Sequence, residues 1–146
     1  MYKKRSDVWS NYSVEYTDSY TKEMDEEGLS ILKWSMFDSP DKLGSGKMFM
    51  ESEPVFILDQ IYKESRIKAF VVQAYTSKYY ADKIKIPSVH PYRLGKAVKV
   101  RVTNKTKRFK LIRGLIQYGI ERIHISNEFV YFDTDNYIRK SEIILF

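Results

Sequence analysis

The run Ala97-Val98-Lys99-Val100-Arg101-Val102 alternates strictly between valine and a second residue. Successive side chains of a β-strand point to opposite faces of the sheet, so the three valines share one face and Ala97, Lys99 and Arg101 share the other. This period of two predicts a strand whose valine face is buried. Asn104 follows closely and is a favourable N-cap, so a helix is expected to begin at residue 105.

The helix expected over residues 105–118 has apolar side chains at helical spacing and ends at Gly119. Four of these side chains form one stripe: Phe109, Ile112, Leu115 and Ile116. The stripe predicts the face of the helix that packs on the core.

A second helix and a second strand are predicted on the N-terminal side of this strand and helix. Pro54 opens a second helix over residues 54–66, and contiguous β-prone residues predict a buried strand over residues 69–74. Two prolines favour a loop over most of residues 76–94.

On the C-terminal side, residues 122–125 and 128–132 predict a hairpin around a Ser126-Asn127 turn. The apolar residues 143–146 are expected to dock on the body. Together these elements predict an α+β fold, with an antiparallel sheet packed against two or three helices.

The first 30 residues differ from the rest because they are polar, rich in tyrosine and without a sustained apolar period. We predict that residues 1–30 form an arm that is flexible alone, or ordered only against the body or a neighbour. Alternation around Val14 and Tyr16 is compatible with one strand in it. Residues 31–146 are expected to form a single domain.

The composition excludes several classes of protein and site. With 146 residues, 43% hydrophobic and 30% charged, the chain is typical of one globular domain. It has no cysteine, which excludes disulfides and thiolate metal ligands, and two histidines, which exclude a three-histidine zinc site. No apolar run is long enough for membrane insertion, and no apolar stretch follows the basic N-terminal residues. We therefore expect cytoplasmic synthesis without a secretion signal.

The charge is uneven along the chain, whose net charge is +6. Residues 83–113 contain eleven basic side chains and no acidic one. Such a run is either a solvated basic face or a surface that binds anions, and the alternatives stay open here. Nucleic acid is one such partner, although the run contains no recognised nucleic-acid-binding module.

Several separated motifs resemble, in order, the small phage and bacterial zinc D,D-carboxypeptidases and endopeptidases of peptidase family M-15. Residues 37–48 read FDSPDKLGSGKM and resemble the opening of that family's domain. Gln73-Ala74-Tyr75-Thr76 stands at its Ser-Gly-Tyr-Arg, and Gly95-Lys96-Ala97-Val98-Lys99 stands at its Gly-x-Ala-x-Asp. Phe129-Val130-Tyr131-Phe132-Asp133 stands at its Phe-Ile-His-x-Asp. The resemblance covers about residues 31–146 and implies a D-Ala-D-Ala carboxypeptidase-like fold.

The resemblance also implies where the catalytic residues would stand, and each of those positions is substituted. In the family, two histidines and one aspartate hold zinc. The corresponding positions are Tyr92, Tyr131 and Lys99, and the substrate-binding arginine corresponds to Thr76. A lysine ammonium has no lone pair for zinc, and a tyrosine ligates only as a phenolate, whose pKa near 10 makes it costly at neutral pH. We therefore expect no catalytic residues, metal or cofactor of the family type, and no family-type hydrolysis.

His90 and His124 offer an alternative, a metal site rebuilt with Asp133 or Glu128. The simpler interpretation makes His90 a loop residue, His124 a partly exposed strand residue and Glu128 a charge at a strand edge. Glu128 stands three residues before Tyr131, where some family members carry their general base.

The substituted positions predict a basic, tyrosine-lined hollow in place of a zinc site, built from Tyr92, Lys99, Arg101 and Tyr131. It would bind an anionic group through charge-assisted hydrogen bonds and stacking, or it would be closed by packing with Lys99 paired to Asp133. The functional prediction is an inactive peptidase-like domain that binds or assembles, as a component of a phage particle. Its partners would be proteins or further copies reached through the arm, or an anionic polymer. The alternative is a protein that binds or hydrolyses peptidoglycan.

Overall fold

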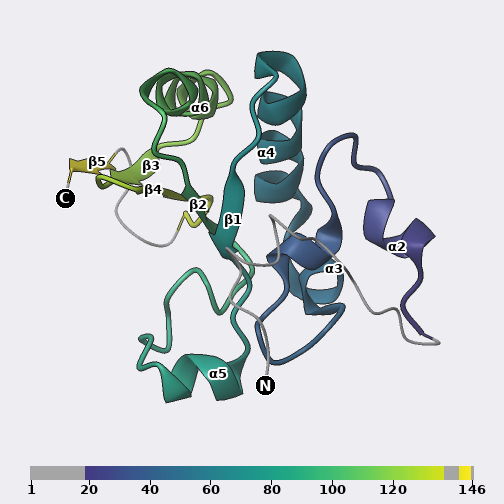
Figure 1. Ribbon diagram of the computed structural model, residues 1–146. Helices are drawn as coiled ribbons and strands as arrows, with labels where there is room; N and C mark the ends of the chain where they lie inside the picture. The colour runs from purple at the N-terminus through teal and green to yellow at the C-terminus, as the bar shows by residue number, and fades with distance from the viewer. Residues whose placement is uncertain (1–18, 137–141, 146) are drawn as a thin grey trace.

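The computed structural model describes residues 19–136 and 142–145, and its centre is a sheet of five strands (Figure 1). The strands are β1 (Phe70–Gln73), β2 (Ala97–Arg101), β3 (Arg122–Ile125), β4 (Phe129–Asp133) and β5 (Glu142–Leu145). Their order across the sheet is β1-β2-β4-β3-β5. All neighbours are antiparallel except β3 and β5, which are parallel. The prediction of an α+β fold with a mainly antiparallel sheet is confirmed.

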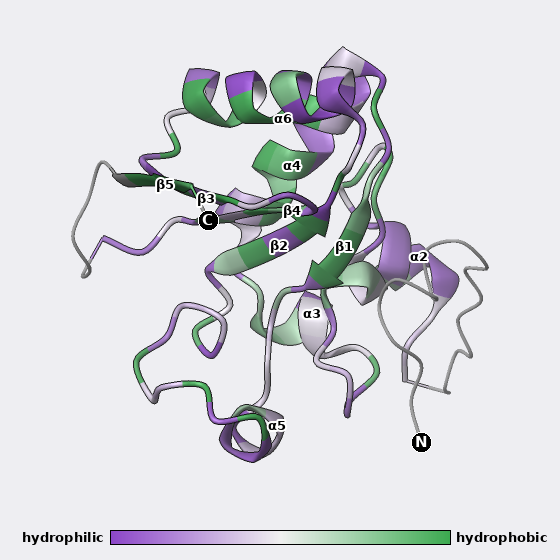
Figure 2. Cartoon of the chain, turned by 60° about the vertical axis from the view of Figure 1, so that its left-hand side comes forward, coloured by the Kyte–Doolittle hydropathy of each residue, from purple (hydrophilic) through white to green (hydrophobic). Residues whose placement is uncertain are grey.

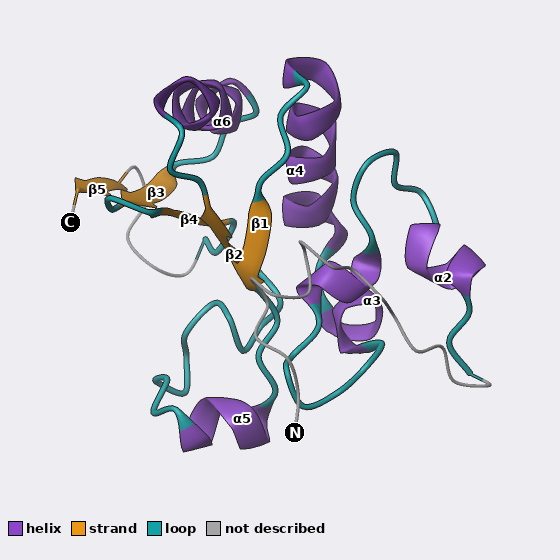
Figure 3. Ribbon diagram, viewed as in Figure 1, coloured by secondary structure: helices purple, strands orange, loops and turns teal. Residues whose placement is uncertain are grey.

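The helices are unequal in length and lie on both sides of the sheet (Figure 3). The two long ones, α4 (Ser52–Ser65) and α6 (Lys105–Gln117), pack against one face. The short ones are α2 (Lys22–Glu26), the 3-10 turn η1 (Trp34–Phe37), α3 (Ser45–Phe49) and α5 (Lys78–Lys83). Helix α5 lies beyond the opposite face, together with the loop that leads to β2 (Figure 1).

The core lies between the sheet and the two long helices. Val98 and Val100 on β2 are fully buried, as the alternation of that strand predicts, and Leu58 of α4 and Leu115 of α6 are fully buried in the same cluster. Each such aliphatic side chain contributes about 1.5–3 kcal/mol through burial. The opposite face of β2 is left for polar and aromatic side chains.

Helix α6 is rotated about its axis relative to the predicted stripe. Leu111, Gly114 and Leu115 are buried, whereas Phe109 and Ile116 are 61% and 52% exposed. The prediction that these two side chains face the core is therefore wrong. The physical reason is the contact with α4, because Gly114 lets the two helices approach closely at Ile61.

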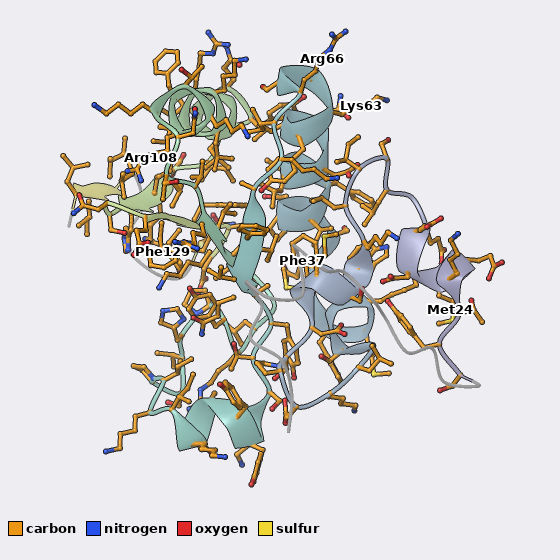
Figure 4. All side chains as sticks on the ribbon, viewed as in Figure 1. Met24, Phe37, Lys63, Arg66, Arg108 and Phe129 are labelled. Carbon is orange, nitrogen blue, oxygen red and sulfur yellow. The ribbon has the colours of Figure 1, made fainter. Side chains whose placement is uncertain are left out.

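Arg108 holds α6 in this rotation from its other side. Its guanidinium donates hydrogen bonds to the backbone oxygens of Val102 at 3.1 Å and Asn127 at 2.8 Å. Figure 4 labels Arg108 between α6 and the strands. The side chain therefore ties the helix to the loop before it and to the β3–β4 turn.

Several boundaries differ from the predicted ones for local reasons. Helix α4 begins two residues before Pro54, because the first turn of a helix needs no N–H from proline. The segment expected to be a loop contains α5, whose first turn is capped when the Ser77 hydroxyl accepts a hydrogen bond from the Tyr80 N–H. Gly44, with φ of +84°, caps α3 where only a turn was expected.

Residues 19–30 of the predicted arm pack against the body. Asp25 is fully buried and accepts hydrogen bonds from the Ser35 N–H at 2.6 Å and from the Tyr20 hydroxyl at 2.8 Å. The weak alternation around Val14 and Tyr16 lies outside the described residues. Within those residues, no helix combines the length and the apolar character needed to cross a bilayer.

Candidate functional site

The candidate site is built on the sheet face that is turned away from the two long helices. The register places Lys99 of β2 beside Tyr131 of β4, and Tyr131 beside His124 of β3. Because directly opposed residues of antiparallel strands point to the same side, the three side chains form one row across the sheet. The sequence prediction that Lys99 and Tyr131 stand together is matched by this register.

Above this row the chain forms a pocket of about 330 Å³. The loop after α5, the three central strands and the β3–β4 turn contribute its lining: His90, Tyr92, Lys99, His124, Ser126, Phe129 and Tyr131. Phe129, labelled in Figure 4, lies below the strands on the side of α5. The pocket therefore has a floor of strand side chains and a wall from the loop.

Aromatic rings in mutual contact form most of this lining. The rings of His90 and Tyr92 stack with their centroids 4.7 Å apart, and Tyr92 meets Tyr131 edge-on at 5.5 Å. The His124 ring also contacts Tyr131, with the ring centroids 5.0 Å apart. Such pairs contribute about 0.5–1.5 kcal/mol each beyond burial, so the cluster is expected to be rigid.

A buried ion pair closes one end of the site. Arg122 donates a hydrogen bond to Asp133 at 2.9 Å, and the two side chains are 5% and 1% exposed. The Tyr131 hydroxyl donates to the other oxygen of Asp133 at 2.7 Å. The predicted pairing of Lys99 with Asp133 is therefore wrong, because Arg122 on the adjacent strand neutralises that carboxylate.

Lys99 faces the pocket, and the carboxylates of Asp133 and Glu128 are each paired with an arginine. The Lys99 Nζ lies 4.4 Å from the centre of the Phe129 ring, a cation–π contact. In the part of the chain that the structure describes, no carboxylate forms an ion pair with it. The pocket therefore carries a positive charge that no carboxylate of the described residues neutralises through an ion pair.

Arg101 and Thr76, the other predicted positions, lie outside this pocket. Arg101 lines an adjoining hollow that also includes Lys99 and Phe129, and it forms an ion pair with Glu128 at 3.0 Å. Thr76 is buried and its hydroxyl donates to the Ala74 carbonyl at 3.0 Å. Its N–H donates to the Tyr92 carbonyl at 3.0 Å, so Thr76 holds the pocket wall through the backbone only.

A hydrogen bond to His90 determines which ring nitrogen carries the proton when the imidazole is neutral. Its Nδ1 accepts a hydrogen bond from the Tyr92 N–H at 3.0 Å, so the neutral ring carries its proton on Nε2. Burial lowers the pKa of His90 below 6.5, although the Asp133 carboxylate opposes this shift. Protonating Nδ1 would also break the bond to Tyr92.

The residues at the family's zinc positions do not fit a zinc ion. Burial raises the pKa of both the Tyr92 and Tyr131 phenols, and the Asp133 carboxylate raises each further. Their phenolates are therefore even less accessible than those of exposed tyrosines, and the Lys99 ammonium offers no lone pair.

The alternative ligands are also committed to other partners. Asp133 is held by Arg122, and Glu128 pairs with Arg101. In residues 19–136 and 142–145, no three histidine, aspartate or glutamate side chains are grouped closely enough to hold a metal ion.

Sequence reasoning left four lining residues out of the hollow: His90, His124, Ser126 and Phe129. The register of the strands contained a signal for two of them, because His124 and Phe129 share a face with Tyr131 once the hairpin is paired. His90 had no such signal, since its position depends on the path of a loop. Arg122 was also missed as the partner of Asp133, although the same pairing places them opposite each other.

Comparison with protein-family models, with curated proteins and with solved structures finds no match to this chain. The resemblance to the M-15 peptidases therefore stays a hypothesis that rests on the quoted motifs.

Proposed function

We propose that this chain is a non-catalytic, peptidase-like binding domain whose sheet-face pocket takes an anionic group of a partner. The observation that carries the proposal is the position of Lys99. Its ammonium faces a pocket of about 330 Å³ among aromatic rings, and the nearby carboxylate of Asp133 is neutralised by Arg122. An anion entering this pocket would gain a charge-assisted hydrogen bond and aromatic contacts at once.

The pocket chemistry favours binding over catalysis. The tyrosines are held in their neutral forms, and Tyr131 donates its proton to Asp133 in a hydrogen bond. A general base must be within reach of a reacting proton with its lone pair free, and Asp133 already accepts bonds from Arg122, Tyr131 and the Asp135 N–H. The groups present can therefore hold a ligand without activating water.

The assembly role in a phage particle is a part of the proposal that rests on the peptidase-like motifs. We expect contact with protein partners or further copies through the N-terminal residues, whose 19–30 portion docks on the body at Asp25. Sedimentation of the full chain over a range of concentrations tests self-association. If the chain is a monomer at every concentration, self-association is excluded and the partner must be something other than a second copy.

Calorimetric titration with two carboxylate or phosphate probes tests the pocket. The probes are inorganic phosphate and a short peptide ending in D-Ala-D-Ala. We expect one of them to bind, and Lys99→Met to weaken that binding about tenfold or more, since a hydrogen bond to a charged group contributes about 1.5–3 kcal/mol. Lys78→Met on α5 is the matched control, because Lys78 is exposed and outside the pocket lining. Equal binding by the wild type and the Lys99 variant would overturn the proposal.

The alternative of a peptidoglycan hydrolase with a rebuilt metal site is favoured by one observation. His90 and His124 both contact the Tyr131 ring, at ring-centroid distances of 6.0 and 5.0 Å. Elemental analysis of protein purified without chelator, followed by zinc titration, separates the two functions. Tight one-to-one zinc binding that is lost in His124→Ala would overturn the non-catalytic proposal, and sacculi would then be the substrate to test.

A further inference from the structure

The outer face of α6 combines exposed cations with an exposed aromatic ring, and it lies on the opposite side of the sheet from the pocket. The helix carries five basic side chains and no acidic one: Lys105, Lys107, Arg108, Lys110 and Arg113. Figure 2 shows purple, hydrophilic segments along α6 at the top of the molecule. Arg108 is committed to backbone carbonyls, which leaves four cations for another partner.

No carboxylate of the described residues forms an ion pair with these four cations, Lys105, Lys107, Lys110 and Arg113. The glutamates near the two ends of the helix are engaged elsewhere. Glu128 pairs with Arg101, and Glu64 accepts a hydrogen bond from the Tyr118 hydroxyl. The surface therefore has a positive field that an anionic polymer would neutralise.

Phe109 stands between Lys105 and Arg113, about one helical turn from each, whereas Lys107 lies on the side of α6 that carries Leu111 and Gly114. The Phe109 side chain is 61% exposed, and the Arg113 guanidinium lies 5.3 Å from the ring centre. An exposed phenyl ring gains no stability from contact with water. Phe109 is exposed because of the rotation that Gly114 and Arg108 impose on α6. The ring with its neighbouring guanidinium offers a flat surface on which a planar group can stack.

We propose that the outer face of α6 binds single-stranded nucleic acid, independently of the pocket. Lys105, Lys110 and Arg113 contact phosphates, and Phe109 stacks on an unpaired base. A duplex would satisfy the cations but would keep its bases away from the ring. An anionic membrane would need a continuous apolar face, whereas Arg113 and the exposed Gln117 border Phe109 and Ile116 on this surface.

Fluorescence anisotropy with a labelled oligothymidine of about 12 nucleotides tests the proposal, since one domain covers roughly 4–16 nucleotides. With three phosphate contacts, the logarithm of the affinity should fall with the logarithm of salt concentration at a slope of about −2. The triple variant Lys105→Gln, Lys110→Gln, Arg113→Gln should remove most of that slope and weaken binding at low salt by about tenfold or more.

A second triple variant, Lys78→Gln, Lys83→Gln, Lys85→Gln, is the matched control. It removes the same charge from exposed positions on α5 and the residues after it. We expect it to change the affinity by no more than about twofold, the effect of net charge alone. An equal loss in both triple variants would show diffuse attraction and would overturn the proposed site.

Phe109→Ala tests the stacking contact without changing charge. Stacking of a base on an aromatic ring contributes enough binding free energy that loss of the Phe109 ring should weaken oligothymidine binding about fivefold or more. Because Phe109 is exposed, circular dichroism should show an unchanged fold. No binding at about 20 mM salt, indifference to Phe109→Ala, tighter binding to a duplex of equal length, or tighter binding to phosphatidylserine vesicles would each overturn the proposal.

Discussion

At the scale of single residues, His90 makes the stability of the fold depend on pH. Its Nδ1 accepts a hydrogen bond from Tyr92, and burial holds the pKa of the imidazole below the unfolded value of 6.5. A depressed histidine pKa means that the stability is complete above pH 6.5 and is lost as the pH falls. We expect the free energy of unfolding, measured in urea, to decline by up to about 1.4 kcal/mol per pH unit below that value.

The variant His90→Asn isolates this contribution. An asparagine side chain can accept a hydrogen bond from the N–H two residues later, as in an Asx turn, but it does not titrate. The decline of stability below pH 6.5 should therefore be shallower in His90→Asn than in the wild type. If both proteins show the same slope, a group other than His90 is responsible for it.

The same scale shows which parts of the site the sequence could predict. Tyr131 and Lys99 could be paired because both lie on strands with a clear period, and a strand period fixes the face of every side chain. His90 could not be placed, since no period governs the loop between α5 and β2. The partner of Asp133 required the register of the hairpin, which the sequence predicted only as a pairing of two runs.

At the scale of elements, α6 shows why a helical stripe alone was insufficient. The predicted stripe is Phe109, Ile112, Leu115 and Ile116, and a second stripe, Leu111 and Leu115, overlaps it at Leu115. Either stripe could face the core by spacing alone. The close approach at Gly114 selects the second stripe, because only a residue without Cβ allows Ile61 of α4 to pack there.

Gly114→Ala tests this helix contact. An added Cβ would stand 2.9 Å from two γ-carbons of Ile61, a β-branched side chain that is 1% exposed and stiff. Although alanine favours helices by about 1 kcal/mol over glycine, we expect a net loss of about 1–2 kcal/mol in thermal or urea unfolding. In an Ile61→Ala background the clash is absent, so the same substitution should stabilise. A stabilising effect in both backgrounds would contradict the close contact.

Asp59 links α4 to the segment before η1. Its carboxylate is buried and accepts hydrogen bonds from the N–H groups of Ser30, Ile31 and Leu32 at 2.8–2.9 Å. Asp59→Asn would turn an amide NH₂ towards one of these donors. The NH₂ would face the Ser30 N–H, the one donor to Oδ2, and the charge-assisted bonds would become neutral ones. We expect a loss of about 1–2 kcal/mol in urea unfolding.

The control for Asp59→Asn is Glu53→Gln in the first turn of the same helix. Glu53 is exposed, and its loss should cost less than about 1 kcal/mol through the helix dipole. Similar losses in the two variants would mean that the three backbone bonds to Asp59 do not stabilise the fold.

At the scale of the whole molecule, the sheet separates two surfaces with different chemistry. Its valine face packs on α4 and α6, and α6 presents cations and Phe109 outward. Its other face holds the tyrosine and histidine cluster around Lys99. Because the two surfaces share no lining residue, ligands of the pocket and of α6 should bind without competition.

The buried tyrosines of both layers make the whole fold sensitive to alkali. Burial raises the pKa of Tyr62, Tyr92 and Tyr131, and Tyr62 lies in the core while the other two line the pocket. A raised tyrosine pKa means that the stability is complete below the unfolded value of 10.0 and is lost as the pH rises above it. Tyrosinate absorbance of these residues should therefore appear together with the loss of circular dichroism.

Tyr131→Phe should make the decline shallower by up to about 1.4 kcal/mol per pH unit, whereas phenylalanine at the 72% exposed Tyr79 should leave it unchanged. If all the tyrosines ionised before the fold was lost, the closed packing of the cluster would be contradicted.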